Sequence, residues 1–365
     1  MVTNVKISWP GAAELAVDVD GVEMRALAYV DLVGEAQPGD RVVLNTTALD
    51  LGLGTGGYAH VVAIPDRLPA DPPPAPGHLV KARYTPLQTT VLGVDEQDSE
   101  WHAALRDADD LFGMPVVVAD LHSALPAILA GLWSTEDSQA GLRSADRAPG
   151  PIRVAYVMTD GGALPLPFSR NVAQLRAAGL LTATVTVGQA FGGDLEAVTL
   201  HTGLLAAKHV VGADIAIVTQ GPGNLGTGTR WGFSGVACGE AINAAVVLGG
   251  RPVGSLRISS ADPRGRHHGV SHHSLTAYSK VALAPADIVV PDLPGEFGEK
   301  VRTQAARLAG RHNLISAPVA GLEDELRRVP VHLSTMGRGL EEDPEYFVAA
   351  AAAGAHAATL LRHDG

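Results

Sequence analysis

One stretch of the sequence, residues 213–274, constrains the fold more than any other part of the chain. It alternates apolar runs with loops, in the order apolar run, glycine-dense turn, small-residue helical pattern, apolar run and histidine-rich segment: 213–219, 221–229, 235–248, 252–258 and 262–274. This order predicts a strand, a glycine loop, a helix, a second strand and a histidine cluster. α/β proteins bind ligands where a loop leaves a strand and enters a helix. The stretch therefore predicts a ligand site.

From residue 81 onward, the rest of the chain also alternates between strand-like and helical patterns. The predicted strands are 89–94, 114–119, 152–158, 181–187, 288–290, 313–316 and 331–334, and the predicted helices are 99–112, 121–133, 169–178, 195–211, 296–309 and 343–361. Such alternation is typical of an α/β fold with a mainly parallel sheet covered by helices on both faces.

The first part of the chain has a different pattern, with short alternating segments and turn signals such as Asp20-Gly21. It predicts a small N-terminal β-barrel-like domain over residues 1–65. Prolines then indicate a linker over 66–80, and the α/β domain follows at 81–365. The glycine-rich segment 45–58 is open to two interpretations, a ligand-facing loop at a domain interface or a tight connection between strands.

The charge and the apolar content exclude several classes of protein. The net charge of −12 argues against a nucleic-acid binder, because phosphate contacts need a basic surface. No apolar run approaches the roughly 20 residues that span a bilayer, so we expect no membrane partner. The N-terminal segment lacks the pattern of a signal peptide, and the single cysteine, Cys238, leaves no disulfide framework within the chain. We therefore expect a cytoplasmic protein.

The sharpest local signal is the pair of histidine doublets at 267–268 and 272–273. His268 and His272 are four residues apart, which places both on one face of a helix, at a spacing that suits a divalent metal. Asp262 is a further candidate ligand. A second interpretation is an anion or acid–base site formed with Arg264 and Arg266. A third is a helix start with a purely structural role. The residues alone do not choose among the three.

The glycine-dense turn is a second candidate. It has no Walker lysine, and although it matches the letters of a dinucleotide fingerprint, no acidic residue ends the next strand. We interpret it as a loop whose backbone approaches a ligand, with packing against another part of the protein as the alternative. The candidate ligand-binding residues are Gly221, Gly223, Asn224, Gly226, Thr227, Gly228, Thr229, Arg264 and Arg266.

Acidic residues follow two predicted strands, at Asp120 and Asp160. A carboxylate in that place can bind a metal or act as a base, although each residue alone is more often a helix cap. Cys238 lies in the small-residue helix and is better explained as a buried apolar side chain than as a nucleophile.

Segments 44–58, 221–229 and 260–274, taken together, resemble a bacterial family known as domain of unknown function 3866. The resemblance runs over nearly the whole chain. It implies a cytoplasmic bacterial protein with a compact β domain ahead of a larger α/β domain. It assigns no catalytic role to any residue.

These observations lead to two functional hypotheses. The first is an enzyme, a hydrolase or a transferase, that acts on a small phosphorylated or nucleotide-like metabolite. Arg264 and Arg266 would hold its anionic group, His268 or His272 would act as acid–base or metal ligand, and Asp160 would assist. The second is a non-catalytic sensor or interaction protein that binds such a ligand. The small-residue helix would also suit a homo-oligomer.

Overall fold

The computed structural model describes residues 1–54, 56–71, 75–134 and 152–361. Its centre is an eight-stranded sheet of order β11-β10-β9-β12-β8-β13-β16-β17, in which every neighbouring pair is parallel. The strands are β8 (Pro115–Val118), β9 (Val154–Thr159), β10 (Ala183–Thr186), β11 (Leu195–Glu196), β12 (Ile215–Gln220), β13 (Arg251–Ser255), β16 (Asp287–Pro291) and β17 (Asn313–Ala317). The predicted α/β class is confirmed. β8 and β12 are buried along their whole length, as expected of strands covered on both faces.

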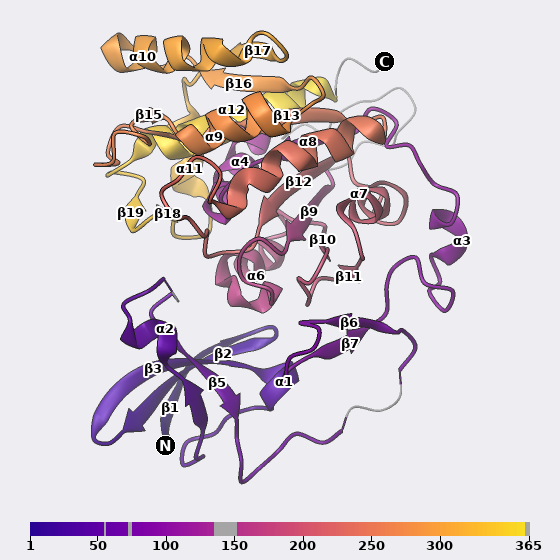
Figure 1. Ribbon diagram of the computed structural model, residues 1–365, viewed down its shortest axis with the longest axis vertical. Helices are drawn as coiled ribbons and strands as arrows, with labels where there is room; N and C mark the ends of the chain where they lie inside the picture. Colours follow the sequence, from indigo (N-terminus) through magenta and orange to yellow (C-terminus); the bar gives the residue numbers. More distant parts are fainter. Residues whose placement is uncertain (55, 72–74, 135–151, 362–365) are drawn as a thin grey trace.

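Helices cover both faces of this sheet (Figure 1). On one face α4 (Leu125–Trp133), α11 (Leu322–Arg328) and α12 (Pro344–Leu360) pack together, and on the other α7 (Leu200–His209) packs beside α8 (Ala237–Val247). Among the described residues of this part, the remaining α-helices are α3 (His102–Leu105), α6 (Arg170–Ala177), α9 (His272–Thr276) and α10 (Gly295–Ala305). No helix of the described residues is long and apolar enough to cross a membrane.

Two glycines allow α4 and α12 to approach each other closely. A Cβ atom at Gly131 would lie 1.8 Å from the carbonyl oxygen of Ala351, and one at Gly354 would lie 2.0 Å from that of Ile128. The two helices therefore touch backbone to backbone, which only residues without a side chain permit. Because α12 also contacts β8, β13 and β16, this contact fixes the helix layer on the sheet that carries the site.

The N-terminal strands form a separate five-stranded sheet of order β1-β2-β3-β5-β4. Its strands are β1 (Val2–Trp9), β2 (Ala12–Val19), β3 (Val22–Tyr29), β4 (Val43–Asn45) and β5 (Ala59–Ala63), with the short helices α1 (Val30–Val33) and α2 (Thr47–Asp50). Among the described residues no strand pairing joins β4 to β1, so the sheet is not a closed barrel.

This N-terminal sheet contacts the α/β part through the segment that follows β9. The indole Nε1–H of Trp9 donates a hydrogen bond to the carbonyl oxygen of Pro167 at 2.7 Å. A Cβ at Gly56 would lie 3.1 Å from the ring of Phe168, whose centroid is 6.3 Å from that of His60. Part of the glycine-rich segment 45–58 thus lies at the interface between the two parts.

A two-stranded ribbon, β6 (Leu79–Lys81) and β7 (Thr89–Val91), runs from the N-terminal sheet to the edge of the large sheet. Lys81 is 2% exposed and donates hydrogen bonds to the carbonyl oxygens of Ala190 and Ala197. Its Nζ also lies 3.4 Å from Oε2 of Glu196 on β11. Burial lowers the pKa of Lys81 and raises that of Glu196, so each group depends on the other to stay charged.

Four predicted elements differ from those observed. The strand predicted over 89–94 is the shorter β7, which pairs with β6 outside the large sheet. The helix predicted over 99–112 is the four-residue α3, and the one predicted over 195–211 begins only at α7, because Leu195 and Glu196 pair with β10 as an edge strand. The strand predicted over 331–334 is not part of the large sheet. Instead β18 (Ser334–Thr335) pairs with β19 (Arg338–Gly339) as a small hairpin. Residues 135–151, between the predicted helix 121–133 and the predicted strand 152–158, and the linker prolines at 72–74 lie outside the described residues.

We predict that Gly131→Ala destabilises the protein. The added methyl group meets the backbone of α12 rather than a movable side chain, so the loss should exceed about 3 kcal/mol, the upper end of ordinary overpacking. Gly310→Ala is the control, because a Cβ there meets nothing within 4 Å. Urea unfolding of both variants measures the difference. Equal stabilities would show that the helices are not in close contact.

Candidate functional site

The candidate site lies at the carboxyl edge of the parallel sheet. β8 is flanked by β12 and β13, and its chain continues into α4 on one face, whereas β12 leads to α8 on the opposite face. Neighbouring strands whose connections leave toward opposite faces open a crevice at the sheet edge. Asp120 comes after β8 and Arg257 comes after β13, so the topology brings both residues to this crevice.

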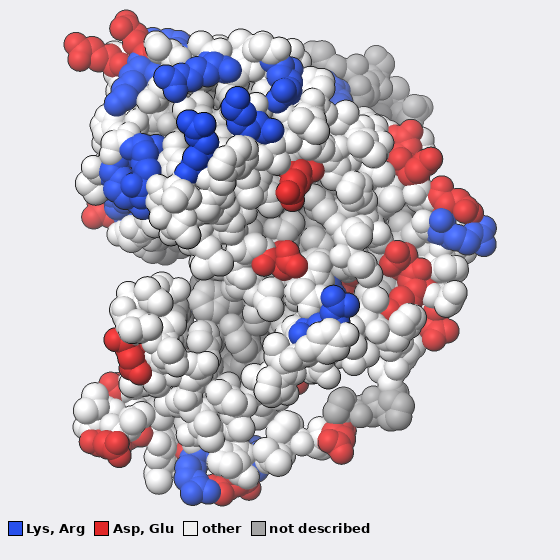
Figure 2. Space-filling view, viewed as in Figure 1, with Lys and Arg blue, Asp and Glu red and all other residues white. Residues whose placement is uncertain are grey.

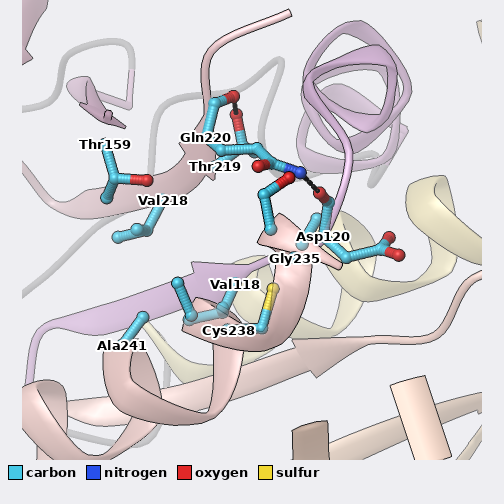
Figure 3. Close-up of a pocket in the computed structure, with 12 residues that line it drawn as sticks. Val118, Asp120, Thr159, Val218, Thr219, Gln220, Gly235, Cys238 and Ala241 are labelled. Atoms are coloured by element: carbon cyan, nitrogen blue, oxygen red, sulfur yellow. Dashed lines mark hydrogen bonds between the residues drawn. The ribbon is translucent and has the colours of Figure 1, made fainter. Parts of the chain in front are cut away.

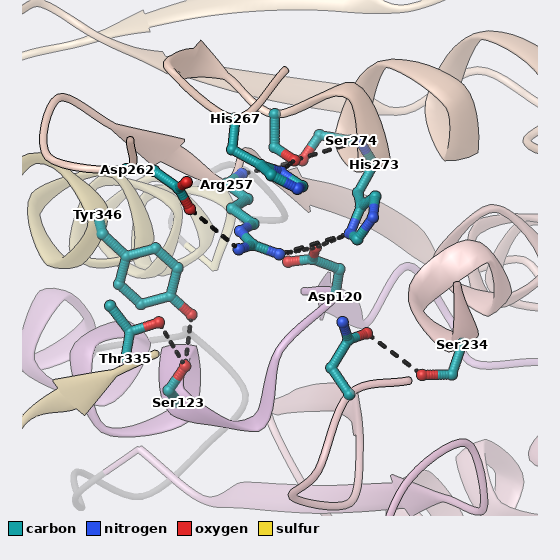
Figure 4. A network of polar contacts seen from close by, with 12 residues as sticks. Asp120, Ser123, Ser234, Arg257, Asp262, His267, His273, Ser274, Thr335 and Tyr346 are labelled. Atoms are coloured by element: carbon teal, nitrogen blue, oxygen red, sulfur yellow. Dashed lines mark hydrogen bonds and ion pairs between the residues drawn. The ribbon is translucent and has the colours of Figure 1, made fainter. Parts of the chain in front are cut away.

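Arg257 is the centre of a buried network of charges (Figure 4). Its side chain is 4% exposed, and its guanidinium nitrogens lie 3.9 Å from Oδ2 of Asp120 and 3.8 Å from Oδ2 of Asp262. Nη1 also lies 3.4 Å from Nδ1 of His273. Oδ2 of Asp120 is buried and makes no hydrogen bond within the described part of the chain. The positive charge of Arg257 is therefore what compensates this carboxylate.

The carboxylate of Asp262 is paired with arginine side chains. Arg264 donates from Nε to Oδ1 at 2.9 Å and from Nη2 to Oδ2 at 2.7 Å, and Nη2 of Arg338 lies 3.6 Å from Oδ2. The hydrogen bonds from Arg264 hold the pKa of Asp262 far below its usual range, so the carboxylate is ionised. A cation would have to displace Arg264 to reach it. The geometry does not favour Asp262 as a metal ligand.

Three histidines gather beside Arg257, but they are not the pair that the sequence spacing indicates. The rings of His267, His272 and His273 pack on one another, with centroids 4.4 to 4.9 Å apart. His268 points elsewhere: its Nδ1 lies 2.7 Å from Nζ of Lys300. The expectation that His268 and His272 share a helical face is wrong, because 269–270 form strand β15, which pairs with β14 (Ile258–Ser259), and α9 begins only at His272.

The surroundings of the cluster keep two of its histidines neutral. Burial lowers the pKa of His267 to about 3, and the positive charge of Arg257 adds to the effect. Burial also lowers the pKa of His272 to about 4, with contributions from His273 and Arg266. Both imidazoles are therefore neutral at pH 7. A neutral imidazole has a nitrogen lone pair that can accept a proton or bind a metal.

A cavity of about 130 Å³ opens beside these residues, and we call it the arginine–histidine cavity. It is lined by Asn224, Gly226, Gly228, Arg257, Arg264, Arg266, His267, His273 and Met336. The glycine loop after β12 and the histidine segment after β13 thus form walls of the same cavity. In the sequence, 28 residues lie between Gly228 and Arg257, and they include helix α8. None of the lining residues is a carboxylate.

The other predicted residues of the glycine loop have different places. A Cβ at Gly221 would lie 2.3 Å from the carbonyl oxygen of Ala163, so this glycine packs against the segment after β9. Gly223 has a φ of 92° and open space around it. Thr227 and Thr229 contact each other at 3.1 Å between their hydroxyls and hold the turn closed. Asn224, Gly226 and Gly228 are the members that reach the cavity.

Asp160 is not brought to this cavity. It is an exposed residue after β9, and its Oδ2 accepts a hydrogen bond from the backbone N–H of Gln189 at 2.8 Å. β9 is separated from β13 by β12 and β8. Asp120 of β8 is the strand-end acid that lies beside the histidines, with Oδ2 at 3.8 Å from Nδ1 of His273.

A second, much smaller cavity lies under α8 and is lined by Asp120, Gln220 and Cys238 among others (Figure 3). Its volume is about 10 Å³, which is at most the space of one water molecule. Burial and the nearby charge of Asp120 raise the pKa of the Cys238 thiol well above its usual value. The thiol therefore stays protonated, which favours its interpretation as a buried apolar side chain.

A separate chain of hydrogen bonds runs through the buried His122. The Thr219 hydroxyl donates to the carbonyl oxygen of Gln220, which can only accept. Tyr156 therefore donates to Thr219 at 2.9 Å, and Nδ1–H of His122 donates to Tyr156 at 2.9 Å. This leaves Nε2 of His122 to accept the hydroxyl proton of Ser169, at 2.6 Å. Burial lowers the pKa of His122 to about 4, consistent with a neutral ring.

The fold and the site together define an α/β protein with a polar, arginine-lined cavity at the carboxyl edge of a parallel sheet. The family model described as protein of unknown function (DUF3866) matches residues 25–354, and the chain belongs to this family. The resemblance seen in the sequence is thereby confirmed. The matched region contains every residue that lines the cavity. The comparison with curated proteins finds no match, and neither does the comparison with solved structures.

We predict that Arg257→Ala destabilises the fold by about 3–5 kcal/mol, because it leaves the buried Asp120 without a compensating charge. The double variant Asp120→Asn/Arg257→Ala should recover part of this loss, because the asparagine side chain at position 120 is neutral and needs no compensating charge. Arg41→Ala, which breaks an exposed ion pair with Asp66, should change little. Chemical unfolding measures all three. A double variant no more stable than Arg257→Ala would show that the charge of Asp120 is not the cause.

The hydrogen-bond chain through His122 predicts a pH dependence of stability. The pKa of His122 is about 4 in the folded protein, below the roughly 6.5 of an unfolded histidine. Protons then bind preferentially to the unfolded chain, so this contribution to stability is lost as the pH falls from about 6.5 to 4, up to about 3 kcal/mol. His122→Gln keeps a donor and an acceptor but does not titrate. As the pH falls from about 6.5 to 4, the unfolding free energy of the wild type should therefore decrease by up to about 3 kcal/mol more than that of His122→Gln.

Proposed function

We propose that the protein is an enzyme, a hydrolase or a transferase, that acts on a small phosphorylated or nucleotide-like metabolite bound in the arginine–histidine cavity. One observation carries the proposal: three arginines and two histidines line the cavity, and no carboxylate does. Arginine forms charge-assisted, often bidentate hydrogen bonds with phosphate and carboxylate groups. The cavity therefore suits an anionic group.

The arginines differ in how free they are to bind a ligand. Arg257 and Arg264 are paired with Asp120 and Asp262, whereas Arg266 has no carboxylate partner within the described residues. Arg266 is also exposed. Lysine and arginine side chains gather over the part of the molecule where Figure 1 places α9 and α10 (Figure 2). Arg266 is thus the residue best suited to meet an incoming anion.

The size of the cavity limits what enters it. One water molecule needs about 10–15 Å³ of such space, so a cavity of about 130 Å³ has room for a phosphate group and the atoms next to it. The rest of a nucleotide-sized ligand would extend into solvent. Gly226 and Gly228 have no side chains to block a ligand from their backbone. The chemistry would therefore occur at or next to the anionic group.

Hydrolysis or transfer at such a group builds up negative charge, which preorganised arginines stabilise. The neutral His267 and His272 supply the lone pairs that this chemistry needs, and the carboxylate of Asp120 lies 3.8 Å from Nδ1 of His273. In this proposal Arg264 and Arg266 bind the anion. The acid–base or metal-ligand role that the sequence assigns to His268 or His272 belongs instead to the cluster of His267, His272 and His273. Asp120 takes the place of Asp160.

A non-catalytic sensor is the second candidate, and a specific observation favours it. Gly161 and Gly162 pack against Gln220 and Gly221 at the start of the glycine loop. A few residues further along, Pro167 and Phe168 contact the N-terminal sheet. A ligand that moves the glycine loop would therefore act on a segment that touches the N-terminal sheet. Such a protein binds its ligand and forms no product.

We predict that phosphorylated compounds stabilise the protein against heat and that Arg264→Ala/Arg266→Ala abolishes the effect. The probes are inorganic phosphate, glycerol phosphate and AMP, with glycerol and adenosine as uncharged counterparts. Arg327→Ala/Arg328→Ala removes the same charge from α11, outside the cavity lining, and should keep the response. Stabilisation that persists in the cavity variant would overturn the assignment of the site. Product analysis by mass spectrometry then separates the enzyme from the sensor.

A further inference from the structure

The histidine cluster has a geometry that the anion alone does not explain. His267, His272 and His273 each offer one ring nitrogen, and these three nitrogens lie within 4.8 Å of one another. They come from a turn and from the first turn of α9, which Ser271 caps by accepting a hydrogen bond from the backbone N–H of His273. Three imidazoles held this close are the donor set of a metal centre.

The hydrogen bonds around the rings leave nitrogens available. Nδ1 of His267 is 2.7 Å from the hydroxyl of Ser271, and Nδ1 of His273 faces Asp120 and Arg257. The second nitrogen of each of these rings makes no hydrogen bond among the described residues. Nε2 of His272 is buried and has no hydrogen-bond partner there. A buried nitrogen without a partner costs free energy unless something binds it.

We propose that His267, His272 and His273 together bind one divalent transition-metal ion, with Zn²⁺ as the best-suited member of the class. Imidazole nitrogens select zinc and its neighbours, whereas Mg²⁺ and Ca²⁺ require oxygen ligands, which this cluster does not offer. Three protein ligands leave a further coordination position for a ligand atom. Since His267 and His273 also line the cavity, an oxygen of the bound anion can fill it. This last step alone rests on the proposed function.

The nearby arginines do not prevent a cation from binding. Arg257, Arg264 and Arg338 each lie within 4.0 Å of a buried carboxylate, so their charges are largely compensated. Asp120, close to Nδ1 of His273, is placed as the outer partner that metal-binding histidines usually have. The exposed Arg266 remains, and it would attract the anion that completes the coordination.

The test is metal binding by the full-length protein after treatment with a chelator. Zn²⁺ is titrated against a chromophoric competitor, and bound metal is counted by mass spectrometry. We expect one equivalent in the wild type. His272→Ala and His267→Ala should each weaken binding by more than about 100-fold, beyond the roughly 10–100-fold that loss of an outer partner costs. His268→Ala is the matched control, because this adjacent histidine contacts Lys300 and Phe297 instead, and it should bind as the wild type does.

X-ray absorption of the zinc-loaded wild type keeps the test decisive if a variant fails to fold. It should show three imidazoles around the metal, and one or none would overturn the proposal. A wild type that binds no zinc, or a His268→Ala loss equal to that of His272→Ala, would overturn it as well. Phosphate binding is measured on the same samples. Zinc binding without phosphate binding would support the metal site and overturn the proposed function. Phosphate binding without zinc binding would support the proposed function and overturn the metal site.

Discussion

The buried guanidinium of Arg257 is the interaction on which the site depends. It lies between carboxylates from two segments, Asp120 after β8 and Asp262 after β13, and it faces the ring of His273 at the start of α9. A charge buried to this degree is tolerated only when opposite charges surround it. Each of these elements is thereby held in one position relative to the others. The wall of the cavity that Arg257 and His273 form is therefore held in place.

The parallel sheet could be predicted from the sequence because its strands are buried on both faces. β9 and β12 read as nearly continuous apolar runs, and that pattern leaves little choice of structure. Elements at the edges carry weaker signals. The sequence at Leu195 and Glu196 predicts the start of a helix. These residues instead form β11, because they pair with the neighbouring strand β10. The segment at 331–334 has the composition of a strand, but only Ser334 belongs to one, the hairpin strand β18, which pairs with β19 and not with the large sheet.

The site was predictable only in part, since its composition depends on the order of the strands in space. β8 comes first along the chain but lies in the middle of the sheet, beside β13. No local pattern reveals this, so the sequence favours Asp160, which follows the more conspicuous strand β9, over Asp120. Arg257 lies inside the apolar run 252–258, where a single charged residue does not indicate that it forms the centre of a site. The glycine loop, Arg264 and Arg266 are predictable because both segments follow strands, whose carboxyl ends meet at one edge of the sheet.

The histidines show why spacing alone misleads. Residues four apart share a face only if the backbone between them is helical. Gly269 has a φ of 85°, and the chain forms β15 before α9 begins, so His268 turns toward α10 while His267 turns inward. The doublets are divided by this local backbone: one member of the first pair and both members of the second meet beside Arg257. The same turn that separates His268 from the cluster places three imidazoles next to an arginine-lined cavity. This arrangement is the basis for proposing that a metal and an anion bind there together.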